Sequence, residues 1–136
     1  MKLGIIGAMQ LEVETLLQRM ENTVEQTVAG STFYQGDLEG LSVVVVQCGV
    51  GKVNAALCVQ ILCDRFAVTH IVNTGIAGSL RSELDIGDFV ISRDAMYHDF
   101  NCTVFGYAYG QVPAMPQSFP ANEMLIEEAF KAAQLI

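Results

Sequence analysis

One carboxylate stands out among the side chains that could do chemistry, because it follows closely on a glycine that ends an apolar run. Glu12 lies three positions after Met9, so the two side chains share one face of a helix that begins just after Gly7. A carboxylate held there could take a proton from a water molecule and act as a general base. Acidic residues such as Glu12 and Glu14 are also common in first turns, where they favour the positive end of the helix dipole. The sequence alone leaves both roles open.

A second feature is the stretch 71–79, which reads Ile-Val-Asn-Thr-Gly-Ile-Ala-Gly-Ser. A short apolar run that ends in small and polar residues is typical of a buried strand opening into a loop. Gly75 and Gly78 have no Cβ, so a flat ligand could approach the backbone closely. Ligands of open α/β sheets bind beyond the carboxyl ends of the strands, where this loop would lie. A tight turn without any ligand is the alternative explanation.

Two more junctions of a strand with glycine share this design, at residues 7–9 (Gly-Ala-Met) and 49–51 (Gly-Val-Gly). Together the three junctions predict a pocket at one edge of the sheet. The first lacks the G-x-G-x-x-G spacing of a dinucleotide site, and the second lacks the spacing of a P-loop. His98 and Asp99 could form an acid/base pair elsewhere, although we favour a structural hydrogen bond for them.

The elements that would position these residues follow from hydrophobic periodicity and turn signals. We expect a pair of strands within 23–39, with turns at Gly30-Ser31 and Gly36-Asp37, and a further turn at 85–88. Asn122 is a good N-cap for the last helix. The other expected strands are 3–7, 41–47, 69–74 and 89–92, and the expected helices are 9–20, 52–66 and 121–136. This order predicts one α/β domain over residues 1–136, with a mainly parallel or mixed central sheet flanked by helices.

Composition narrows the possible partners. Hydrophobic residues make up 51% of the chain and charged residues only 16%, with a mean hydropathy of +0.38, whereas charged residues usually reach about 25%. This excess of apolar residues predicts a partner subunit or further chain to cover it.

A net charge of −8 argues against binding to nucleic acid. No apolar run approaches the roughly 18 residues that span a membrane. Four cysteines without metal-binding spacing indicate free thiols in a cytoplasmic protein.

Several motifs occur together in a characteristic order. They are Met1-Lys2-Leu3-Gly4-Ile5-Ile6-Gly7-Ala8-Met9 with Glu12, Gly49-Val50-Gly51-Lys52-Val53-Asn54-Ala55-Ala56, Asn73-Thr74-Gly75-Ile76-Ala77-Gly78, Ile86-Gly87-Asp88 and Tyr97-His98-Asp99. With these motifs the sequence resembles the bacterial 5′-methylthioadenosine/S-adenosylhomocysteine nucleosidases of the nucleoside phosphorylase superfamily. The resemblance covers all 136 residues and corresponds to somewhat more than the first half of such an enzyme.

The resemblance implies hydrolysis of an adenine–ribose bond, which releases adenine and a thioribose without any cofactor or metal ion. Glu12 would be the base that activates water. Ile76 stands where relatives often carry a hydroxyl residue, so a polar contact with the ligand would be missing. The resemblance places Met9, Val50, Ile76, Ala77 and Gly78 around the substrate.

The resemblance also implies a homodimer, in which Phe105 and Pro113 of the long aromatic loop would cap the site of the neighbouring subunit. The residues that grip ribose and protonate adenine would lie beyond residue 136, so we expect an incomplete fold and half an active site. Two other functions remain open. One is a purine nucleoside phosphorylase, which needs basic phosphate-binding residues, and the other is a truncated, catalytically silent nucleoside-binding protein.

Overall fold

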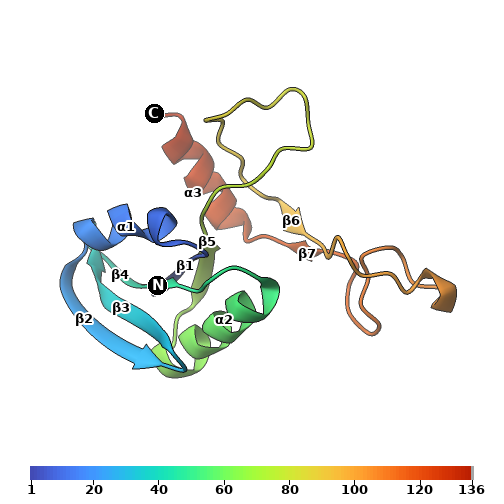
Figure 1. Cartoon of the computed structure of the whole chain (residues 1–136). Coiled ribbons are helices and arrows are strands. Elements are labelled where there is room, and N and C mark those ends of the chain that lie inside the picture. Colours follow the sequence, from blue (N-terminus) through green and yellow to red (C-terminus); the bar gives the residue numbers. More distant parts are fainter. Residues whose placement is uncertain (136) are drawn as a thin grey trace. The chain divides into compact units, whose positions relative to one another are not determined.

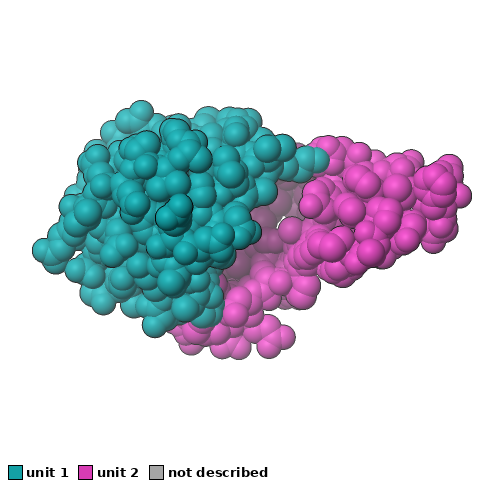
Figure 2. All heavy atoms as spheres, turned by 90° about the horizontal axis from the view of Figure 1, so that it is seen from below, with its two compact units in different colours: residues 1–78 teal, residues 79–136 magenta. Residues whose placement is uncertain are grey.

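The computed structural model describes residues 1–135, and the chain divides into two units, Met1–Gly78 and Ser79–Ile136 (Figure 2). The single domain expected over residues 1–136 therefore stays a prediction.

The first unit is built on a five-stranded mixed sheet with the strand order β2-β3-β4-β1-β5 (Figure 1). Strand β1 pairs in parallel with β4 on one side and β5 on the other, whereas β3 runs antiparallel to both of its neighbours, β2 and β4. The expected mixed α/β sheet is confirmed. The strands are β1 (Leu3–Gly7), β2 (Glu21–Val28), β3 (Ser31–Leu38), β4 (Leu41–Gln47) and β5 (His70–Asn73).

Two helices cover the two faces of this sheet, α1 (Gln10–Arg19) and α2 (Lys52–Phe66). Successive strand side chains point to opposite faces. Val45 of β4 therefore packs in the cluster that includes Val13 of α1, and Val44 packs with Leu62 of α2. Residues 43–46 are all buried, so these two helices are sufficient to cover both faces of the valine strand β4.

The two cysteines of α2 lie on different faces of the helix. Cys58 is buried in the core, whereas Cys63 is exposed. Cys48 follows β4 and is also buried. Burial raises the pKa of the Cys48 thiol, so this group stays protonated and packs as an apolar residue.

The turn expected at Gly36-Asp37 is wrong, because both residues lie inside β3. A Cβ on Gly36 would lie 2.5 Å from the carbonyl oxygen of Glu21, at the place where the pairing of β2 with β3 shifts register. This glycine therefore accommodates a β-bulge rather than a turn. The turn at Gly30 is confirmed between β2 and β3, and a second turn at residues 39–40 joins β3 to β4.

The second unit contains little regular structure. It has a short antiparallel pair, β6 (Asp94–Ala95) with β7 (Phe119–Pro120), a 3₁₀ turn η1 (Thr103–Phe105) and the helix α3 (Glu123–Ala133). Asn122 caps α3 as predicted, since its side-chain oxygen accepts a hydrogen bond from the amide of Leu125 at 3.1 Å. The last residue of the expected helix, 136, lies outside the described residues.

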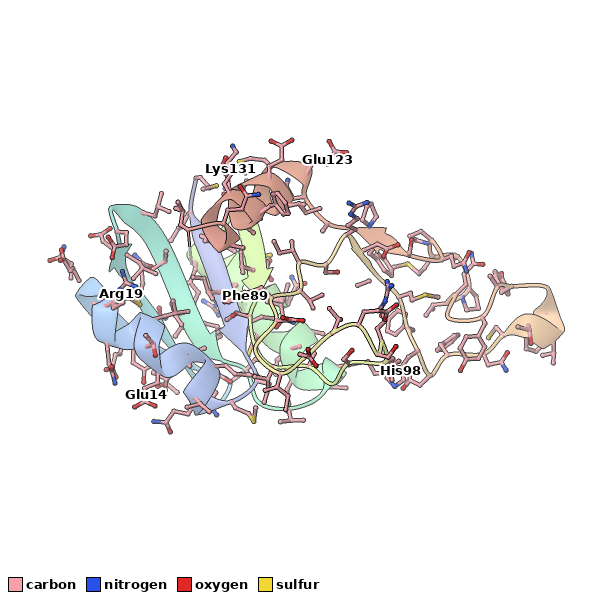
Figure 3. The ribbon with its side chains drawn as sticks, turned by 90° about the horizontal axis from the view of Figure 1, so that it is seen from above. Glu14, Arg19, Phe89, His98, Glu123 and Lys131 are labelled. Atoms are coloured by element: carbon pink, nitrogen blue, oxygen red, sulfur yellow. The ribbon has the colours of Figure 1, made fainter. Side chains whose placement is uncertain are left out.

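The strand expected at residues 89–92 is wrong. This segment is an irregular loop in which Phe89 and Val90 are about 70% exposed (Figure 3). A strand needs a neighbour to pair with its backbone, and no described strand pairs with this segment. The turn at 85–88 is confirmed, because the amide of Asp88 donates to the carbonyl of Asp85 at 3.2 Å. Within residues 1–135, no helix combines the length and the apolar character needed to cross a membrane.

Candidate active site

The three glycine junctions lie side by side at the carboxyl edge of the sheet, as the sequence predicts. They follow β4, β1 and β5, which are adjacent and parallel. Hydrogen bonds extend the pairing beyond the strands, from the amide of Cys48 to the carbonyl of Gly7 at 2.8 Å and from Thr74 to Ile6 at 2.9 Å. The backbone therefore holds all three loops in a fixed register at one edge.

Glu12 lies in the first turn of α1, and its carboxylate bonds to two of these junctions. Its Oε2 accepts a hydrogen bond from the amide of Met9 at 2.8 Å, and its Oε1 accepts one from the amide of Ile76 at 3.0 Å. The bond to Met9 closes the helix N-terminus, where an amide would otherwise lack an acceptor. The bond to Ile76 ties the same carboxylate to the loop after β5.

These contacts favour the ionised form of Glu12. The hydrogen bond from Met9 lowers the pKa of the Glu12 carboxyl most, followed by the bond from Ile76, with a smaller contribution from Ala8. Partial burial acts in the opposite direction, but the pKa still falls below its ordinary value of 4.5. A carboxylate that is charged at neutral pH and fixed at the carboxyl edge of a sheet can accept a proton from a water molecule bound there.

The loop after β4 is held by a residue for which sequence reasoning gave no role. The side-chain amide of Asn54 donates to the carbonyl of Val50 at 2.8 Å. Gly49 and Gly51 both have positive φ, at 82° and 109°, a conformation that favours glycine. The only sequence signal for this role was an asparagine in the first turn of a helix that follows a glycine-rich loop.

The predicted site residues divide between the two units. The structure brings Met9, Glu12 and Ile76 together through hydrogen bonds, and Val50 lies in the neighbouring loop after β4. The side chains of Val50 and Ile76 are 74% and 77% exposed, so they are available to a ligand. The remaining predicted residues are exposed as well: Ala77 and Gly78 end the first unit, and Phe105 and Pro113 belong to the second.

A separate cavity of about 540 Å³ opens beside α1 in the first unit. Its walls come from α1, from the start of β3 and from the end of β4, and include Leu17, Tyr34 and Gln47. Neither Glu12 nor any other predicted site residue lines it. The cavity therefore adjoins the loop after β4, since Gly49 lines it, but it does not include the Glu12 carboxylate.

The fold is that of the open α/β proteins, in which ligands bind at the carboxyl ends of the strands, and the Glu12 carboxylate is held at that edge. Residues 2–136 match the family model of the phosphorylase superfamily, and the chain belongs to this superfamily.

Individual proteins of this superfamily are similar to almost the whole of this chain. The chain is 48% identical over 133 residues to a 5′-methylthioadenosine/S-adenosylhomocysteine nucleosidase of Anoxybacillus flavithermus, in a match covering 98% of this chain and 57% of the relative. The crystal structure of the nucleosidase from Colwellia psychrerythraea in complex with adenine superimposes with a TM-score of 0.96 at 47% identity, over 98% of this chain and 55% of that one. The nucleosidase from Neisseria meningitidis in complex with methylthio-immucillin-A has the same TM-score at 40% identity, over 98% and 58% of the two chains. The chain thus spans little more than half the length of these proteins.

Proposed function

We propose that this chain supplies the water-activating part of a nucleosidase that hydrolyses the adenine–ribose bond of 5′-methylthioadenosine and S-adenosylhomocysteine. The observation that carries the proposal is the ionised Glu12 carboxylate, held at the carboxyl edge of the sheet by the amides of Met9 and Ile76. The names of the relatives and the adenine and nucleoside-analogue complexes of the solved structures support this choice of substrate.

In the proposed reaction, Glu12 takes a proton from water while the water oxygen forms a bond to the anomeric carbon of the ribose. The bond from that carbon to the adenine nitrogen breaks, and its electron pair stays with adenine, which must gain a proton. Glu12 acts as a base and is not the donor of this proton. We infer that the donor comes from the portion of the protein that corresponds to the unmatched part of the relatives.

Hydrolysis is favoured over phosphorolysis by the charge at the site. In a phosphorylase, phosphate would have to bind close to the anionic carboxylate of Glu12, and two negative charges in close proximity repel each other. The three loops 7–9, 49–51 and 75–78 contain neither lysine nor arginine. A purine nucleoside phosphorylase is therefore the weaker alternative.

The test uses a chimera in which residues 1–136 are joined to the portion of the Anoxybacillus flavithermus nucleosidase outside the matched region. We expect the chimera to release adenine from 5′-methylthioadenosine equally fast with and without phosphate. A strict requirement for phosphate would show a phosphorylase instead. Binding of the nucleoside without turnover would identify a silent binding protein.

The unmatched portion also bears on the activity of residues 1–136 alone. A polypeptide of these residues should release no adenine, because the inferred proton donor for the leaving group lies in the unmatched portion. Adding the remaining portion as a second polypeptide should restore release. Full activity of residues 1–136 alone would contradict this division and would require an acid within them, with Asp99 the first to substitute.

We propose further that the protein is a cytoplasmic homodimer acting in methionine salvage, with the Phe105 loop reaching the neighbouring subunit's site. Val104 and Phe105 are 84% and 76% exposed on η1, and exposed apolar groups that lie together often mark an interface. Light scattering of the chimera should give the mass of a dimer, and Phe105→Ser should raise the KM for the nucleoside. A fully active monomer at micromolar concentration would contradict the shared site.

A further inference from the structure

The space beside Gly75 is occupied by the carboxylate of Glu12. A Cβ built on Gly75 would fall against Oε1 of Glu12, 2.7 Å from its Cδ and 3.2 Å from its Oε2. Real side chains do not approach this closely, so any residue other than glycine at this position must displace the carboxylate. The amide of the next residue, Ile76, donates to that same Oε1 at 3.0 Å.

The carboxylate cannot move away while it keeps its present contacts. Its other oxygen is bonded to the amide of Met9 at 2.8 Å. Helix α1 is itself packed closely on β1, since a Cβ on Gly7 would lie 2.7 Å from Cγ1 of Val13 and 3.1 Å from the Cβ of Glu12. A shift large enough to make room for a side chain at residue 75 would therefore break at least one hydrogen bond to the carboxylate.

We propose that Gly75 is a positioning residue for the base of the reaction, and that Glu12 in return fixes the Gly75–Ile76 backbone where it borders the nucleoside. The inference deepens the proposed function, because it concerns the same carboxylate. It gives Glu12 two roles, as a base and as the link between the N-terminus of α1 and the loop after β5. The two roles are separable, because hydrogen bonding can be measured without any turnover.

The test compares Gly75→Ala with Gly78→Ala in the 136-residue chain, by NMR titration of the Glu12 side-chain carboxyl and by amide hydrogen exchange. A Cβ on Gly78 would meet no described atom within 4 Å, so this variant controls for the addition of a methyl group to the same loop without a clash. In Gly75→Ala we expect the pKa of Glu12 to rise towards 4.5 and the Ile76 amide to exchange about fivefold faster, the effect of losing one ordinary hydrogen bond. The thiol of Cys48 also interacts with Glu12, and it stays protonated over this range. An unchanged titration and unchanged exchange would overturn the proposal.

A second variant keeps the proposal testable if Gly75→Ala does not fold. Glu12→Gln replaces one acceptor oxygen by an NH₂ group, which cannot accept the hydrogen bond of a backbone amide. One of the two amides, Met9 or Ile76, should then exchange about fivefold faster, while Glu14→Gln leaves both unchanged. Normal exchange at both amides in Glu12→Gln would show that the carboxylate positions neither loop. Because no readout depends on adenine release, failure of the proposed hydrolysis would be seen separately in the chimera.

Discussion

The carboxylate of Glu12 and the backbone amide of Ile76 are joined by a 3.0 Å hydrogen bond across 64 positions of sequence. The bond connects the first turn of α1 to the loop after β5, at the edge where the three glycine junctions meet. It fixes the direction of the carboxylate and lowers its pKa. The first two predictions concern this one group.

Glu12→Gln in the chimera should lower adenine release by about a hundredfold or more, because the amide cannot take a proton from water. Binding of the nucleoside should persist, since the side chain keeps its size and its carbonyl oxygen can still accept one of the two backbone hydrogen bonds. The matched control is Glu14→Gln, two positions along the same helix, where the side chain is exposed and bonded to Gln18 (Figure 3). The measurement is kcat and KM for both variants. Near-normal kcat in Glu12→Gln would exclude the role as base.

Acid should destabilise the first unit through Glu12. Its pKa is lower in the folded chain than the ordinary 4.5, so the folded state binds fewer protons than the unfolded state between those two values. The contribution of Glu12 is therefore complete above pH 4.5 and is lost as the pH falls through the lower, folded pKa. Urea unfolding at a series of pH values measures this effect. As the pH falls, the free energy of unfolding should decrease less in Glu12→Gln than in the original chain. The same decrease in the free energy of unfolding in both proteins would contradict the lowered pKa of Glu12.

Leu62 should contribute strongly to stability through the face of α2 that packs on the sheet. Its side chain is fully buried, and Leu62→Ala should cost about 2–5 kcal/mol in the free energy of unfolding. Leu57→Ala changes the same residue type on the same helix at a position that is 48% exposed, and should cost about 1 kcal/mol or less. Urea denaturation measures both variants. Equal losses would mean that α2 packs on the sheet through a different face.

Asn54→Asp should loosen the loop after β4. The substitution keeps the shape of the side chain but removes the NH₂ group that donates to the carbonyl of Val50. Because a hydrogen bond of this kind is worth about 0.5–1.5 kcal/mol, the affinity of the chimera for the nucleoside should fall roughly two- to tenfold. Isothermal titration with a non-hydrolysable analogue measures this change. Unaltered affinity would show that the Val50 loop needs no such support.

The sequence by itself determined most of the first unit. Helix α2 and strand β4 begin and end at the predicted residues, 52–66 and 41–47. Their signals are local, namely four consecutive valines for the strand and a glycine loop before an apolar periodic run for the helix. The sequence also predicted that the three glycine junctions lie side by side, because parallel strands place their carboxyl ends at one edge of a sheet.

Tertiary structure decided what depends on neighbours distant in the sequence. Gly36 resembled a turn residue, but the carbonyl of Glu21 on the next strand gives it a place inside β3. The apolar segment 89–92 resembled a strand, yet without a described partner strand it remains a loop. Whether Glu12 was a solvated first-turn residue or a fixed carboxylate could not follow from local pattern either. The fold decided it, because only the packing of β1 against β5 brings the amide of Ile76 within hydrogen-bonding distance of that side chain.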